Sequence, residues 1–366
     1  MTNILEISKK LSEKISNVET QKSSRTAGDH QSFLYAMEYI LTDIWKKYYT
    51  HPDNNPSLQK NKNYYSLLKR YRDKKLTYFM LKQAFDGLMG LQLIYVTKEQ
   101  YYDFIKMEGS LTRYSAREEL IEMLKEIPDY PSSQIEPNLD DETILLSNIV
   151  NSQKNLVDYE EDAFTDKARN NLRIINKCFS KHWFDLKIKN EDEKKLQERL
   201  LFDNEKEPID LTKRTLARIF INNSFEEDGR FFRGWWHNVP SEYRSFITID
   251  SKLAAEYDFS QLNPNMIYSR YNHELGNVDA YDRVLDGEHR IIVKQVFNAM
   301  MQAKTDLEHK PKTINLDEVG MSWKELKEAI LKAHKPIKDL FFTGLGNRLQ
   351  FENSQITENV MLQFVK

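Results

Sequence analysis

Residues 246–264 read FITIDSKLAAEYDFSQLNP, and this stretch decides the fold class that we expect. Its first four residues favour a strand, a turn follows, and residues 253–259 alternate as a second strand does. Asn263-Pro264 then predicts the start of a helix, with Asn as the cap and Pro at the first helical position. Because helical periodicity dominates most of the chain, we predict an α+β fold that is predominantly helical.

The carboxylate of Asp258 is the candidate metal ligand in this stretch. On the predicted second strand it shares one face with Glu256, so it points outward at the end of the strand. Hard Mg²⁺ prefers one or two carboxylates together with phosphate oxygens. Taken alone, the pattern fits a solvated acid at a strand end better than it fits a metal ligand.

A second feature, the helix predicted from His289 to Ala303, changes that balance. Arg290, Lys294 and Asn298 recur every four residues, which places their side chains on one face. Two cations at this spacing can bind the phosphates of a triphosphate together, because Arg can donate two parallel hydrogen bonds and Lys provides a compact positive charge. Exposed helices of unrelated function also carry Arg and Lys four residues apart, so the pattern is weak when it stands alone.

Upstream, residues 229–244 interleave arginines with large aromatic residues. Stacking planes beside phosphate-binding cations are the combination used on single strands. Arg230, Arg233 and Asn238 are therefore candidate nucleic-acid ligands. For Trp235 and Trp236 a structural role in a core is equally plausible.

In order, these three segments resemble the family A polymerases, the group that includes the single-subunit phage-type RNA polymerases. The family's segment before the palm looks like Gly229-Arg230 with Asn238-Val239-Pro240. Its first palm motif looks like Asp258-Phe259-Ser260-Gln261. Its fingers helix has the Arg and Lys spacing of Arg290 and Lys294. A narrower likeness is to uncharacterised polymerase-like proteins of bacterial mobile elements, carried by Gly234-Trp235-Trp236, Asn298-Ala299-Met300 and His334-Lys335-Pro336-Ile337.

The resemblance implies a template-dependent nucleotidyltransferase of a mobile element or a phage-related system. Its partners would be a DNA or RNA template and primer and a nucleoside triphosphate. Mg²⁺ would be its cofactor, held by Asp258, which would be both the metal ligand and the catalytic carboxylate. The nucleotide-binding residues would be Arg290, Lys294, Asn298 and Gln261.

Three departures from the family matter. Asn263 replaces a Glu that restricts the sugar in the DNA polymerases, and Asn298 and Gln302 replace family residues of the fingers helix, so no sugar preference carries over. Two-metal transfer also needs a second carboxylate, which the family supplies from a His-Asp hairpin after a long helix. Here the helix is expected, with the apolar face Ile356, Val360, Met361 and Phe364. The sequence then stops at Lys366.

We therefore expect the palm and fingers region, residues 229–366, to be truncated before its second catalytic carboxylate. The chain would be inactive or incomplete on its own, or a second chain would supply the His-Asp strand. The competing interpretation is a non-catalytic DNA-binding replication or regulatory protein with a degenerate palm domain.

The N-terminal region, residues 1–125, is expected to be a winged-helix-like DNA-binding domain. An amphipathic helix closed by Gly90 precedes a strand at 91–96, a partner strand at 109–114 and a helix at 118–124, the order of a winged helix. The basic segment ahead of them includes the candidate DNA ligands Lys69, Arg70 and Arg72. An ordinary helical domain with a solvated basic face explains the same pattern.

The composition of the chain bears on the extent of any nucleic-acid surface and on the cellular compartment. The 53 Lys and Arg nearly balance the 56 Asp and Glu, so any nucleic-acid surface is local. Cys178 is the only cysteine, which fits a reducing compartment, and neither a signal peptide nor a membrane span is apparent, so we expect a cytoplasmic protein. Pro-rich residues 126–142 are predicted as a linker, and residues 143–228 as a helical, thumb-like connection.

Overall fold

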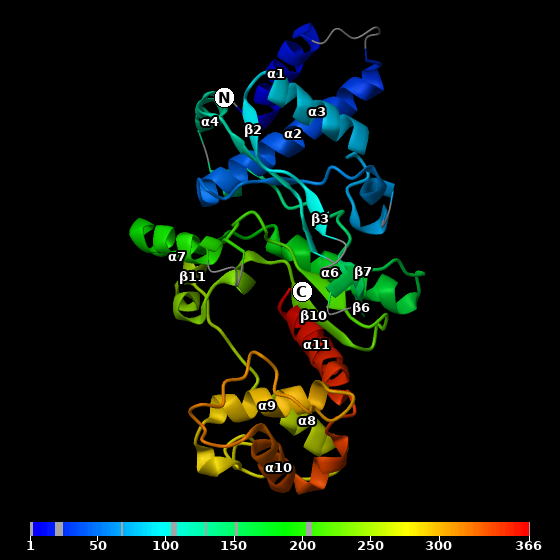
Figure 1. Ribbon diagram of the computed structural model, residues 1–366, viewed down its shortest axis with the longest axis vertical. Helices are drawn as coiled ribbons and strands as arrows, with labels where there is room; N and C mark the ends of the chain where they lie inside the picture. Colours follow the sequence, from blue (N-terminus) through cyan, green and yellow to red (C-terminus); the bar gives the residue numbers. More distant parts are fainter. Residues whose placement is uncertain are drawn as a thin grey trace. The chain divides into compact units, whose positions relative to one another are not determined.

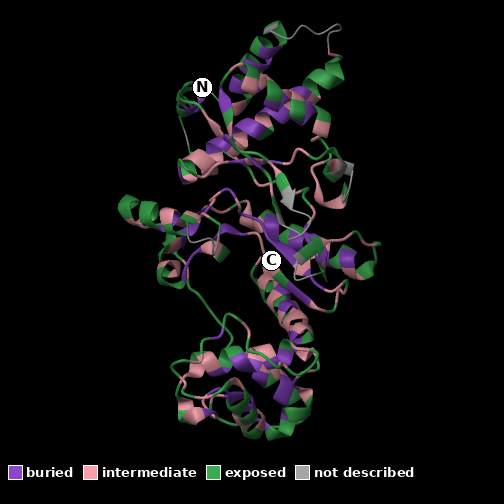
Figure 2. Ribbon diagram, viewed as in Figure 1, coloured by how far each residue is buried: buried purple, intermediate pink, exposed green. Residues whose placement is uncertain are grey.

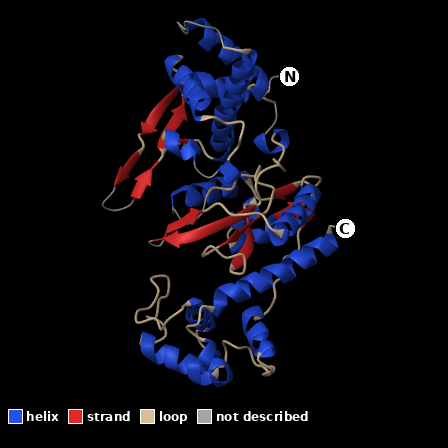
Figure 3. Ribbon diagram, turned by 90° about the vertical axis from the view of Figure 1, so that its right-hand side faces the viewer, coloured by secondary structure: helices blue, strands red, loops and turns tan. Residues whose placement is uncertain are grey.

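The computed structural model describes residues 3–18, 25–66, 69–103, 108–128, 130–150, 153–202 and 207–365. About half of the described residues are helical, and the described strands form three small sheets and one short two-stranded ladder. Figures 1 and 3 show these helices and strands. The predicted α+β class, with helix predominating, is confirmed. The chain divides into two compact units, each built from three segments. The first unit comprises Met1–Thr143, Asn176–Leu216 and Arg233–Ala255, and the second comprises Ile144–Ile175, Ala217–Phe232 and Glu256–Lys366.

The N-terminal part of the first unit packs four helices on a small sheet. The helices are α1 (Ile4–Val18), α2 (Ala27–Thr50), α3 (Tyr78–Gly90) and α4 (Glu118–Lys125). The antiparallel sheet has the order β1-β5-β2, from β1 (Ser57–Leu58), β5 (Thr112–Ala116) and β2 (Ile94–Lys98). Beyond it, β3 (Tyr101–Asp103) pairs with β4 (Glu108–Ser110). Apolar side chains of all four helices meet in one core, seen as buried ribbon in Figure 2.

Local patterns located these elements well. The helix predicted to close at Gly90 is α3, whose side-chain cap is Thr77, and the helix predicted at 118–124 is α4. The first strand begins three residues later than predicted, at Ile94. Gln92 has a positive φ of 57°, and the Leu93 amide donates to the Leu88 carbonyl, so residues 91–93 belong to the turn that ends α3.

The rest of the first unit is a smaller α/β assembly. Helix α7 (Asn190–Phe202) accompanies a three-stranded sheet of order β12-β11-β8, from β12 (Lys252–Leu253), β11 (Ile247–Ile249) and β8 (Phe184–Leu186). The 3-10 helices η3 (Trp235–Asn238) and η4 (Ser241–Phe246) lead into β11. Residues 126–142, predicted as a linker, hold the one-turn helix α5 (Pro131–Gln134) and are grouped with the first unit.

The second unit is built on the four-stranded sheet β10-β9-β6-β7. Its strands are β10 (Asp228–Phe232), β9 (Ala217–Phe220), β6 (Ile144–Val150) and β7 (Gln153–Leu156), and only the β6–β9 pair is parallel. The region 143–228, predicted as helical, thus holds α6 (Ala163–Phe179) and α7 but also several strands. Runs such as Ile144-Leu145-Leu146 pack in the interior of a sheet, which periodicity alone does not distinguish from a buried helix.

Four further helices complete the second unit. Helices α8 (Leu262–Arg270), α9 (Arg290–Gln302) and α10 (Trp323–Ala333) share a core around Phe297 and Ile330. The 3-10 helix η6 (Lys335–Leu340) follows α10, and the long helix α11 (Leu345–Phe364) packs on β10. Among the described residues, no helix combines the length and the apolar composition that crossing a bilayer requires.

The long helix α11 is confirmed, but its buried face is the opposite of the predicted one. Of the four residues of the predicted face, Ile356, Val360 and Phe364 are exposed and Met361 is half-buried, whereas Ser354 and Glu358 are buried. The reason is Arg218 on β9, whose side chain is 0% exposed. A guanidinium taken out of water needs charged and polar partners, and α11 turns its polar face inward to provide them.

Candidate nucleotide-binding site

The candidate site lies in the second unit, where the start of α8 meets the face of α9. Helix α9 runs from Arg290 to Gln302, nearly as predicted, and buries Val293, Val296 and Phe297. Helix α8 begins at Leu262, two residues earlier than Asn263-Pro264 suggested, and Gln261 is its cap residue in the left-handed region. Since Asn263 does not cap the helix, its side chain is available for other contacts.

Three contacts join the two helices and the loop between them. The Asn263 amide donates to the Asn298 side chain at 3.4 Å. The Gln261 side-chain oxygen accepts from the backbone N–H of Ala280. Arg290 of α9 donates to Asp279 at 2.6 Å. The cap residue of α8 and the first residue of α9 therefore both bind the loop at residues 279–280. The structure thus brings together Gln261, Arg290 and Asn298 from the predicted set of nucleotide-binding residues.

Arg290 is held by acidic partners that the sequence did not reveal. Besides Asp279, the carboxylate of Asp282 lies 3.6 Å away, and the guanidinium is 5.3 Å from the centre of the Tyr281 ring. The hydrogen bond to Asp279 raises the pKa of Arg290 above its usual range. Burial works against ionisation of Asp279, but the bond from Arg290 keeps the pKa of this acid below its usual value. The guanidinium is 41% exposed and has five N–H donors, so it can still bind an anion.

Lys294 lies one turn after Arg290 on α9 and is exposed. Helix geometry places its side chain on the same face as Arg290 and Asn298. The N-terminus of α9 adds partial positive charge beside Arg290. This face therefore suits a polyphosphate, provided that the phosphate shares Arg290 with Asp279.

The predicted hairpin is present, as β11 and β12, but its second strand ends at Leu253 and does not extend to residue 259. Asp258 therefore lies in an irregular loop and not at the end of a strand. Strand β12 ends at Leu253, and its partner β11 has only three residues, of which Thr248 and Ile249 pair with β12. Residues 256–259 are exposed, and Tyr257 is 93% exposed. An alternating pattern produces a strand only where one face has something to pack against.

Glu256 is the acid nearest to Asp258 along the chain. Glu256 is exposed in the same loop, and no three His, Cys, Asp or Glu side chains converge anywhere among the described residues. The acids of α11 are engaged elsewhere: Glu352 pairs with Arg270, and Glu358 with Arg218 at 3.2 Å. A single carboxylate with phosphate oxygens and water suits one Mg²⁺, but it does not provide a two-metal clamp.

Gly229 and Arg230 lie on β10, where Gly229 forms the bulge of the β10–β9 pair. Its φ is +71°, and a Cβ there would lie 2.6 Å from the Phe220 ring, so only glycine fits without strain. Its carbonyl accepts from Arg218 at 2.8 Å. Arg230 is partly exposed and pairs with Asp228 at 2.7 Å. The glycine thus has a structural role, and the arginine faces outward.

Arg233 and the following aromatics belong to the first unit and are structural. Burial lowers the pKa of Arg233, against the opposing effect of Asp141 and Glu142, and its guanidinium donates to the Glu142 carbonyl at 2.7 Å. Trp235 is 0% exposed, and Trp236 stacks on Phe184 at 5.2 Å between ring centres and 24° between planes. Asn238 ends the 3-10 helix η3 and is partly buried. The structural interpretation is correct for Trp235, which lies in the core, and Trp236 packs partly buried against that core.

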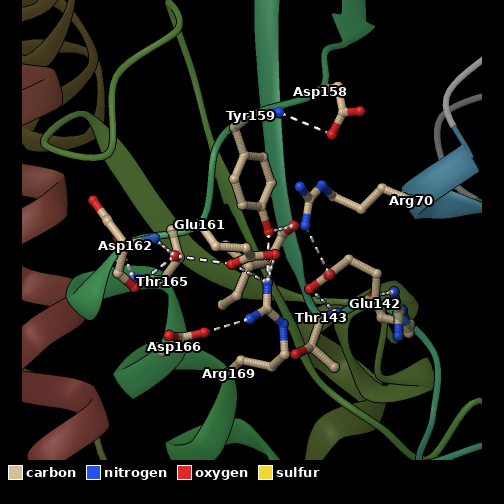
Figure 4. Close-up of polar contacts among 12 residues, drawn as sticks. Arg70, Glu142, Thr143, Asp158, Tyr159, Glu161, Asp162, Thr165, Asp166 and Arg169 are labelled. Carbon is tan, nitrogen blue, oxygen red and sulfur yellow. Dashed lines mark hydrogen bonds and ion pairs between the residues drawn. The ribbon is translucent and has the colours of Figure 1, made fainter.

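The basic segment of the first unit is only partly available to a ligand. Lys69, Lys74 and Lys75 are exposed. Arg70 instead lies 3.8 Å from the carboxylate of Glu142, as Figure 4 shows. Arg72 is half-buried, with its guanidinium 5.9 Å from the centre of the Tyr65 ring.

In the second unit, the acidic run before α6 has its own counterion. Arg169 bonds to Glu161 at 2.9 Å and to the Tyr159 hydroxyl at 3.0 Å, and it contacts Asp166 at 3.3 Å (Figure 4). The Tyr159 hydroxyl in turn donates to the Ile144 carbonyl, which ties the run to strand β6. The cluster therefore anchors a loop to the sheet.

His334, from the string that marked the narrower family likeness, is fully buried beside the candidate site. Its Nδ1 lies 3.0 Å from the Tyr268 hydroxyl of α8, and its ring contacts Phe297 of α9. Burial, together with the nearby Arg283, lowers the pKa of His334 to about 4, although the Ala280 backbone acts in the opposite direction. The imidazole is therefore neutral and links the two helices that form the site.

Acidification is expected to destabilise the protein through His334. The folded state keeps this group neutral, whereas the unfolded chain binds a proton below about pH 6.5. Between pH 6.5 and 4 the free energy of unfolding should therefore fall, by about 3 kcal/mol from this group. Urea unfolding across this range would measure the slope in the wild type and in His334→Gln. The variant should have the shallower slope, and equal slopes would contradict the assignment.

Comparisons with models of protein families, with curated proteins and with solved structures returned no match for this chain.

Proposed function

We propose that this chain binds a nucleoside triphosphate as part of a template-dependent nucleotidyltransferase of the family A polymerase type. The observation that carries the proposal is the meeting of α8 and α9: Gln261 and Arg290 bind the loop at residues 279–280, and Asn298 bonds to Asn263 of α8. These residues come from two short motifs that resemble the palm and fingers motifs of that family. Convergence of both motifs in one place is what a shared nucleotide site requires.

In this proposal Arg290 and Lys294 neutralise the phosphates of the nucleotide, and Asp258 binds Mg²⁺ together with phosphate oxygens. The metal would polarise the α-phosphate for attack by a primer hydroxyl. Arg230, exposed on β10, is a candidate contact to primer or template. A catalytic cycle would need a further carboxylate, so we propose that extension depends on a second chain or segment that supplies one.

Neutralising the α9 face is expected to weaken nucleotide binding. Lys294→Gln and Arg290→Gln should each raise the Kd for a fluorescent nucleoside triphosphate about tenfold, because each removes a charge-assisted hydrogen bond to phosphate. Binding would be measured by titration in Mg²⁺ buffer. Replacing Asp258 with Asn should leave binding in EDTA unchanged and abolish the gain in affinity that Mg²⁺ provides.

The matched control for these variants is Lys338→Gln, which removes an exposed lysine of η6 in the same unit. Its Kd should equal that of the wild type. If Lys338→Gln weakened binding as much as Lys294→Gln, the attraction would be a general charge effect and the site would be disproved. The proposal also fails if no triphosphate binds at millimolar concentration.

A second candidate function is DNA binding without catalysis, which the topology of the first unit favours. The order helix α2, strand β1, the basic 3-10 segment, helix α3 and strands β2 and β5, with sheet order β1-β5-β2, resembles that of a winged helix and supports this candidate. The exposed face of α3 carries little net charge, since Lys82 pairs with Asp86. Affinity would therefore come from the lysines of the preceding segment.

Replacing the exposed lysines Lys69, Lys74 and Lys75 with Gln is expected to weaken binding to duplex DNA and to flatten its salt dependence. Each lost phosphate contact should reduce the slope of log K against log salt by about 1. Fluorescence anisotropy at several salt concentrations would measure both effects. Lys194→Gln, an exposed lysine of α7 in the same unit, is the control. Unchanged affinity and slope in the triple variant would identify the segment as a solvated face.

A further inference from the structure

The second unit contains a cavity of about 380 Å³ that takes no part in the α8–α9 site. Trp323 and Phe342 provide aromatic walls, and Lys327 lines the cavity between them. The Lys327 ammonium lies 5.7 Å from the centre of the Trp323 ring and 5.6 Å from that of Phe342. The volume lies at the lower end of the range for ligand cavities, about 300–1,000 Å³.

The Leu307 carbonyl holds two side chains of the cavity lining in place without a ligand. The Leu307 carbonyl accepts from the Trp323 indole Nε1 at 2.8 Å and from the Lys327 ammonium at 2.8 Å. A capping box at Ser322 and Glu325 fixes the start of α10, where Trp323 is the first helical residue. A cavity whose side chains are already ordered binds its ligand at a lower entropic cost.

Lys327 has an unusual environment for a lysine. The residue is 8% exposed, and its ammonium contacts Asp306 as well as the Leu307 carbonyl. An ammonium has three N–H donors, so one remains for an acceptor on a ligand. A buried lysine that lines a cavity close to two aromatic rings provides a specific polar contact there.

The charges around the cavity determine which ligand fits. Lys327 is balanced by Asp306, and Lys324 lies 4.0 Å from Glu328, which leaves Glu308 on the rim as an excess negative charge. A phosphate is therefore disfavoured. A cationic ligand is also disfavoured, because the Lys327 ammonium lies 5.7 Å from the Trp323 ring centre and 5.6 Å from that of Phe342 and would repel it. A neutral, planar group with a hydrogen-bond acceptor meets both conditions.

We propose that this cavity binds an unstacked nucleobase of a single-stranded nucleic acid, which stacks on Trp323 and accepts a hydrogen bond from Lys327. Nucleobases are flat, uncharged and rich in carbonyl and ring-nitrogen acceptors, and aromatic residues bind them with little sequence preference. The choice of a nucleobase over another planar ligand rests on the proposed function, since a template-dependent enzyme handles single strands. The cavity would hold one base outside the α8–α9 site.

Photocrosslinking of the full chain tests this assignment. A short single-stranded oligonucleotide that carries one 5-iodouracil is irradiated with the protein, and the adduct is located by mass spectrometry. We expect an adduct at Trp323. It should fall about tenfold in Lys327→Met, which keeps the aliphatic packing but removes the donor. Lys332→Met, which removes an exposed lysine of α10 outside the cavity lining, should leave the yield unchanged.

A competition experiment on the wild-type protein needs no variant, so its outcome does not depend on how a variant folds. Free uridine should suppress the Trp323 adduct, whereas ribose 5-phosphate, which has no base, should not. Equal competition by the two compounds, or an equal adduct yield in Lys327→Met, would overturn the proposal. An adduct only at other residues would overturn it while leaving the proposed function intact. Absence of any adduct would also overturn the nucleobase proposal. The separate triphosphate titration would then show whether the proposed function fails as well, because that function predicts triphosphate binding.

Discussion

Replacing Glu358 with alanine is expected to lower the free energy of unfolding by about 3–5 kcal/mol, because it leaves a buried arginine without its counterion. Arg218 is 0% exposed and donates to Glu358 at 3.2 Å, to the Gly229 carbonyl at 2.8 Å and to the Ser354 hydroxyl at 2.7 Å. These bonds join strands β9 and β10 to helix α11. Chemical unfolding of the full chain would measure the loss.

Two further variants test this explanation. Glu352→Ala is the matched control, since Glu352 is also on α11 but pairs with Arg270 in a partly exposed position, and it should cost less than about 1 kcal/mol. The double variant Arg218→Met with Glu358→Leu removes both charges and should recover most of the stability. If Glu358→Ala were as stable as Glu352→Ala, the buried pair would not be holding α11 to the sheet.

Trp235→Ala is expected to have a comparable effect in the first unit, about 3–5 kcal/mol, because it empties a large buried site. Trp235 is 0% exposed in a core with Phe184, Leu196 and Val239. Thermal and urea unfolding would measure the change. The effect should appear without any nucleic acid present.

Phe246→Ala is the control for this prediction. Phe246 lies in the same unit but is 44% exposed, so its removal should cost about 1 kcal/mol or less. A Trp235 variant of unchanged stability with weaker binding to single strands would restore the stacking interpretation of this segment and contradict its structural role.

The α8–α9 site was predicted in part because its chemistry is local. Arg290, Lys294 and Asn298 share a face by helix geometry alone, and α9 formed where the periodicity placed it. The acids that restrain Arg290 were not predictable. Asp279 and Asp282 reach it only because the loop between α8 and α9 folds back, and no local pattern encodes that path.

At Asp258, by contrast, the local sequence pattern predicted a strand that did not form. Alternation over residues 253–259 is the pattern of a strand, yet β11 is too short to pair with it and neither face finds a core. A strand depends on a partner far along the chain, whereas a helix satisfies its backbone within a few residues. For this reason the helices α3, α4 and α9 were located from the sequence and the strand at Asp258 was not.

For helix α11, the local sequence predicted the helix but not which of its faces is buried. The amino-acid order was enough to predict a helix there, because propensity and spacing act within a few turns. Which face is buried depended on Arg218, which lies on another element of the fold. Its charge requires Ser354 and Glu358 in the interior and leaves Ile356, Val360 and Phe364 exposed. A buried charge that is far away in the sequence outweighs the hydrophobic pattern of the helix itself, because an unpaired charge in the interior costs more than a few exposed apolar side chains.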